Sequence, residues 1–169
     1  MRHTRTATLV VAGLLALTAC SGSDDTSSST EAGQSAADSK QAAPVDAKQV
    51  IASLAEKISS AKPATVYTAA TDPNNLLGRP GGYTSKADFT DDRAKPKLDD
   101  EVQNGGSVEV FDDPAAAEDR AKSIADILKA AKIFGTEYHY VNGGVLLRVS
   151  GALTPDQAAE YEAALKTLG

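Results

Sequence analysis

Few residues of this 169-residue chain have a type and spacing that suggest chemistry, and the first of them is its single cysteine, Cys20. This cysteine stands between an apolar stretch and a run rich in Ser and Asp. With no second cysteine, the chain cannot form an internal disulfide. The thiolate of Cys20 is therefore free to act as a nucleophile, which is the form in which cysteine accepts a diacylglycerol group.

Metal-ligating residues are sparse. The chain has two histidines, His3 near the N-terminus and His139 inside a predicted strand. A lone histidine without a cysteine or a second histidine nearby is a poor transition-metal site. Aspartate pairs at 91–92, 99–100 and 112–113 offer oxygen ligands, but none has the alternating spacing and glycine of a calcium loop. We interpret these pairs as solvated charges and predict that the protein has no metal and no cofactor.

Catalytic motifs are also missing. The sequence contains no G-x-S-x-G elbow, and its Gly-rich segment 78–82 (GRPGG) lacks the Lys-Ser/Thr ending of a phosphate loop. Glycoside hydrolysis by paired carboxylates would need aromatic sugar platforms, and the chain has no tryptophan. A Ser or Thr acting with His139 and an aspartate is compatible with the composition, but nothing in the sequence places them together. We therefore predict a domain that is not an enzyme, with a small hydrolase of unrecognised site as the alternative.

The stretch NNLLGRPGGYTSKADF, at 74–89, is the best candidate for an interaction site. It combines turn-forming residues with a cation and an aromatic side chain, and loops of this kind often carry function. We single out Arg79, Tyr83 and Lys86 as a possible binding rim, since Arg and Tyr are favoured at binding hot spots. The alternative is a scaffold role, in which the two leucines of this stretch enter the core and its glycines turn the chain into an edge strand.

The N-terminal sequence has the pattern of a targeting segment. Arg2 and Arg5 precede an apolar stretch at 7–19, which is too short to span a bilayer but has the length of a signal-peptide core. The residues Leu17-Thr18-Ala19-Cys20 then resemble the lipobox of bacterial lipoproteins. The resemblance implies lipidation of Cys20, cleavage before it and, in many bacteria, further N-acylation, so that several acyl chains anchor the chain in the membrane. The alternative is an ordinary secreted protein with a chance cysteine.

A tether and one domain follow. Segment 21–44 contains no Val, Ile, Leu, Met or aromatic residue, so it cannot bury enough surface to fold and we predict a flexible linker. We divide the chain into a signal peptide at 1–19, a lipidated cysteine with tether at 20–45 and a single domain at 46–169. Loss of the signal peptide takes the formal charge from −6 to −8, which gives no electrostatic basis for nucleic-acid binding.

The domain is predicted to be α+β. Apolar spacing and capping residues indicate an N-terminal helix from 46, and further helices at 114–133 and 154–167. Alternation predicts strands at 83–90, 107–111, 136–141 and 145–150, and the short apolar run at 64–70 is a further candidate strand. The expected fold is a four-stranded, mainly antiparallel sheet, ferredoxin-like or a permuted variant. Its predicted strand order is 83–90, 107–111, 145–150, 136–141, with the helices at 114–133 and 154–167 on one face.

These observations favour a lipid-anchored, extracytoplasmic binding domain at the outer face of the cell membrane. Its partner would be a protein, a peptide or a cell-wall component. The chain is similar in this respect to small Ala-rich lipoproteins of undefined activity from high-GC Gram-positive bacteria. Segment 140–165 also resembles the end of the inhibitory propeptides of subtilisin-type proteases, which implies an inhibitor domain as a further alternative, although the final strand of those propeptides is missing here.

Overall fold

The computed structural model describes residues 45–95, 100 and 102–168, and the predicted signal peptide, lipidation site and tether lie outside these residues. The described part is α+β and contains three α-helices, five strands and two 3-10 turns. In chain order they are α1 (Ala47–Lys57), β1 (Ala61–Val66), β2 (Ser85–Asp91), η1 (Val102–Asn104), β3 (Gly105–Val110), α2 (Pro114–Ala130), η2 (Lys132–Phe134), β4 (Glu137–Asn142), β5 (Val145–Ser150) and α3 (Pro155–Lys166).

The strands form one antiparallel sheet in the order β1-β2-β3-β5-β4. The order β2-β3-β5-β4 agrees with the prediction, but the sheet has five strands where we expected four. The added strand, β1, pairs with β2 at the edge and begins before the apolar run that we noted at 64–70. It contains Lys62 and Pro63 and is largely exposed, so its sequence lacks the alternation that marks the other strands.

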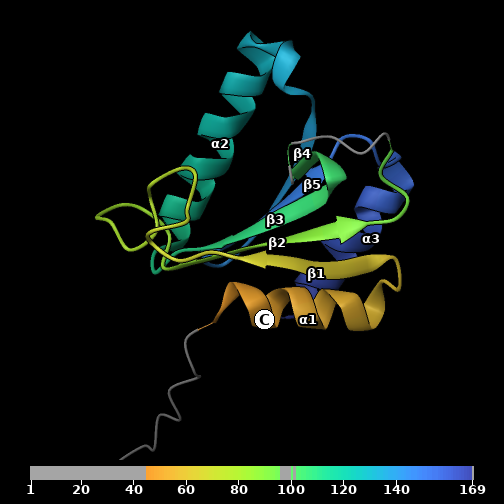
Figure 1. Cartoon of the computed structure of the whole chain (residues 1–169), viewed down its shortest axis with the longest axis horizontal. Coiled ribbons are helices and arrows are strands. Elements are labelled where there is room, and N and C mark those ends of the chain that lie inside the picture. The colour runs from red at the N-terminus through yellow and green to blue at the C-terminus, as the bar shows by residue number, and fades with distance from the viewer. Residues whose placement is uncertain (1–44, 96–99, 101, 169) are drawn as a thin grey trace, which may run out of the picture. The chain divides into compact units, whose positions relative to one another are not determined.

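The helices lie on both faces of the sheet, which corrects the prediction that those at 114–133 and 154–167 share one face (Figure 1). Helices α1 and α3 pack together on one face, whereas α2 packs on the other face against β4 and β5. The physical reason lies in β5, where Leu147 faces the first group of helices and Leu146 faces α2. A strand that is apolar on both sides needs cover on both sides.

The larger core lies between the sheet and the pair α1 and α3. Its centre contains Val108, Val110, Leu147 and Val149. Phe89 of β2 stacks on Tyr161 of α3 with ring centroids 5.1 Å apart. Its ring lies over β3 at Gly106, where an added Cβ would be 2.4 Å from the ring. Glycine at this position therefore allows the aromatic pair to lie close to the sheet.

The smaller core lies under α2. It contains Phe111 and Leu146, the helix residues Ala117 and Ile124, and Tyr83, whose ring meets that of Phe111 edge-on at 5.8 Å. The predicted strand at 83–90 placed Tyr83 on the same face as Ala87 and Phe89, but β2 begins only at Ser85, and Tyr83 lies on the opposite face.

Helix α2 is shorter than predicted. It ends at Ala130, and the chain continues through η2 to Gly135, whose φ of +87° is one that glycine adopts readily. The half of this face over β2 and β3 carries the charged side chains of Lys86, Asp88 and Glu109 instead of apolar ones.

Candidate functional site

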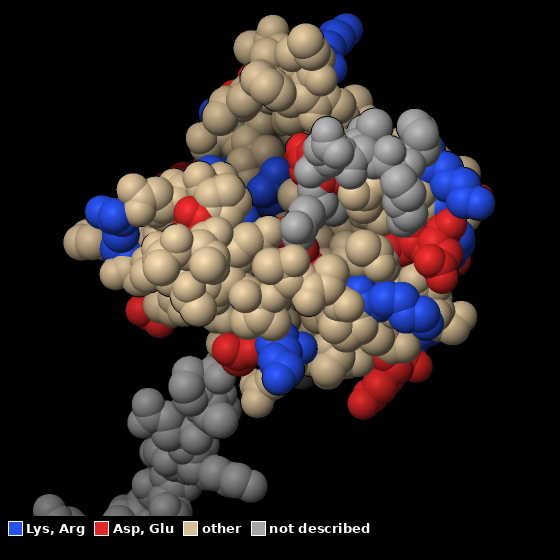
Figure 2. Space-filling model, in the orientation of Figure 1, with Lys and Arg blue, Asp and Glu red and all other residues tan. Residues whose placement is uncertain are grey.

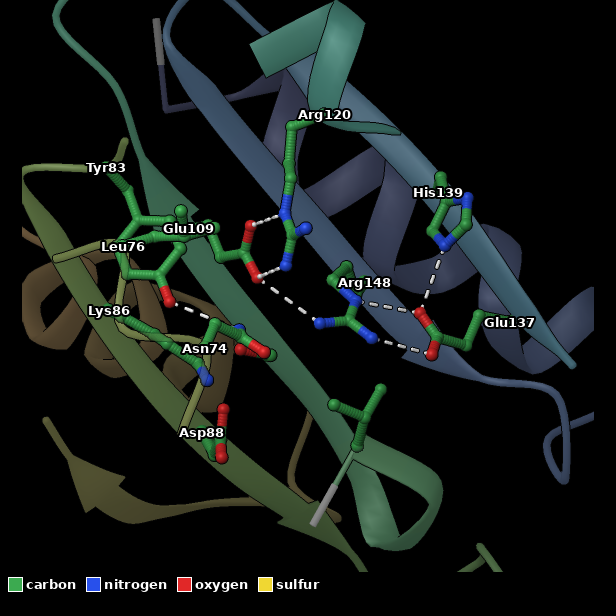
Figure 3. A network of polar contacts seen from close by, with 12 residues as sticks. Asn74, Leu76, Tyr83, Lys86, Asp88, Glu109, Arg120, Glu137, His139 and Arg148 are labelled. Carbon is green, nitrogen blue, oxygen red and sulfur yellow. Dashed lines mark hydrogen bonds and ion pairs between the residues drawn. The ribbon is translucent and has the colours of Figure 1, made fainter. Parts of the chain in front are cut away.

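Charged side chains from four sheet strands and from α2 meet on the α2 face of the sheet (Figure 3). Pairing of β2 with β3 sets Lys86 opposite Glu109, and pairing of β4 with β5 sets His139 opposite Arg148. Because side chains alternate along a strand, these groups face away from the valines of the larger core. We use the name ion-pair network for five of them, Glu109, Arg120, Glu137, His139 and Arg148.

Arg148 is the centre of the ion-pair network. Its Nε and Nη2 donate to the two carboxylate oxygens of Glu137 at 2.8 and 2.7 Å, and its Nη1 donates to Glu109 at 3.2 Å. Arg120 of α2 also donates to Glu109, at 2.8 and 3.3 Å, and His139 Nε2 lies 3.0 Å from Glu137. Such bidentate pairs fix both partners in one geometry. The network therefore ties α2 to β3, β4 and β5.

The contacts of the network hold Glu137 and Arg148 in their charged forms. Burial opposes ionisation of Glu137, but hydrogen bonds with His139 and Arg148 and the charge of Arg148 outweigh it and lower the pKa of Glu137 to about 2. Burial likewise disfavours the Arg148 cation, yet its bonds to Glu137 and Glu109 raise the pKa of Arg148 above its usual value. At neutral pH Glu137 is a carboxylate and Arg148 a guanidinium.

Next to the network lies a cavity of about 460 Å³, which we call the polar pocket. Lys86, Asp88, Arg148 and Asp100 line it, together with Tyr67, Thr71, Pro73, Asn74 and Val102. In Figure 2 charged atoms of both signs are visible in the hollow beneath α2. The pocket thus combines cations and anions with a tyrosine ring, which suits recognition of a polar ligand.

The carboxylate of Asp72 organises the loop between β1 and β2, which borders the polar pocket. Asp72 accepts hydrogen bonds from Tyr83 Oη at 2.6 Å and from the backbone N–H groups of Leu76 and Leu77 at 2.8 and 3.0 Å. Burial of Asp72 raises its pKa, but the bond from Tyr83 and the backbone bonds, including one from Asn74, outweigh this and lower the pKa to about 2. The loop is therefore built around an ionised Asp72.

Lys86 projects into the polar pocket from β2. Its side chain is only 4% exposed, and its Nζ lies 3.6 Å from Asp72 and 4.3 Å from the ring centroid of Tyr67. Tyr67 Oη in turn donates to Asp88 at 2.6 Å. The structure records ion-pair and cation–π contacts for the ammonium, but no hydrogen bond to another described residue. Its three N–H donors remain able to bind an acceptor in the pocket.

The three candidate residues of the sequence analysis do not form a common exposed rim. Tyr83 is fully buried, and Lys86 meets the same carboxylate as Tyr83, that of Asp72. Arg79 is exposed on the loop and donates to Asn75 at 2.5 Å. The two leucines of this stretch pack against the smaller core, as the scaffold alternative expected. The structure thus brings Lys86 and Tyr83 together and leaves Arg79 apart.

Sequence reasoning missed Asp72, Glu109, Glu137 and Arg148. The sequence pattern could have indicated two of them. Glu109 and Arg148 each lie between core residues in a strand, at positions that face away from the larger core. A charged residue there indicates a face that is polar, but not whether the face is solvated or closed by an ion pair.

The aspartate pairs differ in their surroundings. Asp91 is buried rather than solvated, and it bonds with Tyr161 Oη at 2.6 Å and with Arg93. Asp113 caps α2 through the N–H of Ala115 at 3.0 Å, and Asp99 lies outside the described residues. Over the described part of the chain, no group of three His, Cys, Asp or Glu side chains is placed to hold a metal ion.

Comparison of the chain with protein-family models, curated proteins and solved structures finds no match. Among the helices within residues 45–95 and 102–168, none is long and apolar enough to cross a bilayer.

Proposed function

We propose that the protein is a lipid-anchored binding domain at the outer face of the cell membrane, and that its polar pocket binds a carboxylate or another small oxyanion. The observation that carries the ligand class is the ammonium of Lys86, which is buried in the pocket without a hydrogen bond to another of the residues that the structure describes. A buried charge is costly unless hydrogen bonds replace those it made to water. An oxyanion in the pocket would supply such bonds.

Arg148 adds a second cation to the same pocket. A guanidinium has five N–H donors, of which three are engaged by Glu137 and Glu109 in the recorded bonds. Because those carboxylates fix its plane, Arg148 would meet a ligand without losing much side-chain freedom. Lys86 and Arg148 would then bind the ligand from β2 and β5.

The charge states favour binding over acid–base catalysis. A general acid or base works best when its pKa lies near the operating pH. The pKa values of Asp72 and Glu137 are both about 2, so these carboxylates remain ionised at neutral pH and serve as fixed hydrogen-bond acceptors. This distinction supports a binding domain rather than the small hydrolase that the sequence left open.

The proposed location rests on the N-terminal sequence. Residues 17–20 resemble a lipobox, and the linker composition of 21–44 matches a tether between a lipidated cysteine and a folded domain. A binding domain held at the membrane surface would meet ligands from the cell exterior, such as a peptide carboxylate or an acidic wall fragment.

Titration with succinate and with inorganic phosphate, followed by backbone amide NMR shifts, tests the binding site. We expect saturable shifts at the polar pocket that Lys86→Met weakens about tenfold or more, because a hydrogen bond to a charged group is worth about 1.5–3 kcal/mol. Met fills similar space, and Asp72 keeps its hydrogen bonds from Tyr83 and from the backbone, so the variant is expected to stay folded. Lys62→Met, on exposed β1, is the matched control and should bind like the wild type. Equal binding by the Lys86 variant would contradict the proposed site.

A further inference from the structure

Exposed apolar side chains cluster at the far end of α2. Ile127, Ile133 and Phe134 are 52, 90 and 59% exposed, and they lie in the last turns of α2 and in η2. Figure 1 shows α2 extending away from the sheet with η2 at its end. In Figure 2 the surface at this end is mostly uncharged, with a cation beside it. We call residues 127–134 the α2 tip. Isolated exposed apolar residues are normal, but a projecting group of three suggests a contact surface.

Two lysines accompany these apolar residues. Lys129 and Lys132 lie within the tip, and neither makes an ion pair shorter than 4 Å with a described carboxylate. One turn earlier, Lys122 and Asp126 neutralise each other at 2.6 Å. The tip therefore carries positive charge beside its apolar side chains, although the chain as a whole is acidic.

The size and charge of the tip favour a lipid surface over a protein partner. A stable protein interface buries about 800 Å² on each side and engages about 20–30 residues, far more than this convex tip offers. Pairing of two tips in a dimer would bring the lysines of both copies together. A bilayer needs no matching shape, accepts apolar side chains at the boundary of its headgroups, and attracts lysine when its lipids are anionic.

We propose that the α2 tip inserts Ile133 and Phe134 into the interface of an anionic membrane, with Lys129 and Lys132 at the lipid phosphates. This inference is independent of the polar pocket, and it draws on the proposed anchor only for the presence of a bilayer near the domain. Residue 45 enters α1 on the other side of the sheet from α2 (Figure 1). The predicted tether can still reach around the domain, because about 25 extended residues span roughly 80 Å.

The absence of tryptophan from the sequence allows a direct test. In the chain from residue 20 onward, carrying Cys20→Ser, Phe134→Trp introduces a single tryptophan at the tip. Val66→Trp is the matched control, because Val66 is 53% exposed on edge strand β1. With vesicles of phosphatidylglycerol and phosphatidylcholine in equal parts, we expect the Phe134→Trp emission to move to shorter wavelength and to be quenched by brominated acyl chains. The control emission should not change. Unchanged emission from both variants would overturn the proposal.

Vesicle sedimentation of the same Cys20→Ser chain tests the contribution of each side chain. The double variant Ile133→Ser and Phe134→Ser should partition into vesicles about tenfold more weakly, or weaker still. The reason is that the serine side chains do not gain the free energy of burying apolar surface in the membrane. Both residues are exposed, so an unchanged melting temperature confirms that the variant is folded. Lys129→Gln with Lys132→Gln should weaken binding only to the anionic vesicles. Equal partitioning of the serine variant and the parent chain would exclude the insertion.

Two further outcomes identify other occupants and would also overturn the proposal. If the Phe134→Trp emission shifts with protein concentration in the absence of lipid, the tip contacts a second copy of the chain. If it responds to native membranes but not to vesicles made from their extracted lipids, the tip contacts a membrane protein.

Discussion

At the scale of single residues, two buried tyrosine–aspartate pairs stabilise opposite sides of the sheet. Tyr83 donates to Asp72 and Tyr161 donates to Asp91, each at 2.6 Å. Burial raises the pKa of both phenols, and the adjacent carboxylates raise it further. Each tyrosine thus remains a hydrogen-bond donor, and each aspartate remains an ionised acceptor with a pKa of about 2. The pairs join a loop to the smaller core and the end of β2 to α3.

These pKa values predict how stability depends on pH. A carboxyl whose pKa is about 2 in the folded state and about 4 in the unfolded state stabilises the fold above pH 4. Asp72, Asp91 and Glu137 all behave in this way, so the free energy of unfolding should fall as the pH drops from about 4 to about 2. Each group should contribute roughly 2 kcal/mol at neutral pH.

Tyr83→Phe isolates one of these contributions. The variant keeps the ring that meets Phe111 and removes the bond to Asp72, so at pH 7 it should lose about 1–3 kcal/mol of stability. That loss should shrink as Asp72 becomes protonated below pH 4. Tyr138→Phe is the control, because its hydroxyl donates to the uncharged backbone carbonyl of Leu153. Denaturant unfolding measured between pH 7 and pH 2 would reject this account if both variants showed the same pH dependence.

At the scale of elements, alternation and capping residues predicted much of the fold. The strand pattern of 107–111 and 145–150 led to the central pairing of β3 with β5, which the structure has. The side of the sheet taken by α2 could not be predicted in the same way, because an apolar stripe shows that a helix is buried but not on which face. β1 was recognised only in part, since its hydrogen bonds come from β2 and its side chains are mostly exposed.

The candidate site was less predictable than the fold for a related reason. Lys86 and Tyr83 are near one another in sequence, and both were singled out. Their shared partner, Asp72, lies 11 residues before Tyr83 in an irregular loop, and the second cation, Arg148, comes from a distant strand. Such a cluster depends on strand register and loop geometry, which a single sequence does not encode in any local pattern.

The capping box of α3 gives a test at this scale. Thr154 Oγ1 accepts from the N–H of Gln157 at 3.3 Å, and Gln157 Oε1 accepts from the N–H of Thr154 at 2.9 Å. Thr154→Ala should cost about 1 kcal/mol of stability, because the N–H of Gln157 at the helix start loses its side-chain acceptor. Thr154→Ser keeps the hydroxyl and should retain most of the stability. If thermal unfolding finds the two variants equally destabilised, the hydroxyl is not the source of the effect.

At the scale of the whole molecule, the two faces of the sheet have different roles. The face under α1 and α3 is closed by a continuous apolar core. The other face is covered by α2 at β4 and β5, and it carries the ion-pair network and the polar pocket beside the helix. The proposed binding site and the α2 tip thus belong to the same side of the sheet. Both proposals, the bound oxyanion and the lipid contact, therefore concern this one side of the domain.

The proposed lipid anchor at Cys20 can be tested in cells. A single acyl chain binds membranes only marginally, whereas the two or three chains expected on a lipidated Cys20 anchor a protein stably. Cys20→Ser should therefore move the protein from the membrane fraction of a bacterial host to the medium, or leave it unprocessed with its signal peptide. Immunoblots of both fractions measure this, and Ser21→Ala is the matched control that keeps the lipobox. An inhibitor of lipoprotein signal peptidase should cause the unprocessed form to accumulate. If neither Cys20→Ser nor the inhibitor changes the distribution or the size of the protein, residues 17–20 are not a lipobox. The proposed membrane location is then wrong. The binding site in the polar pocket does not depend on it and is tested separately.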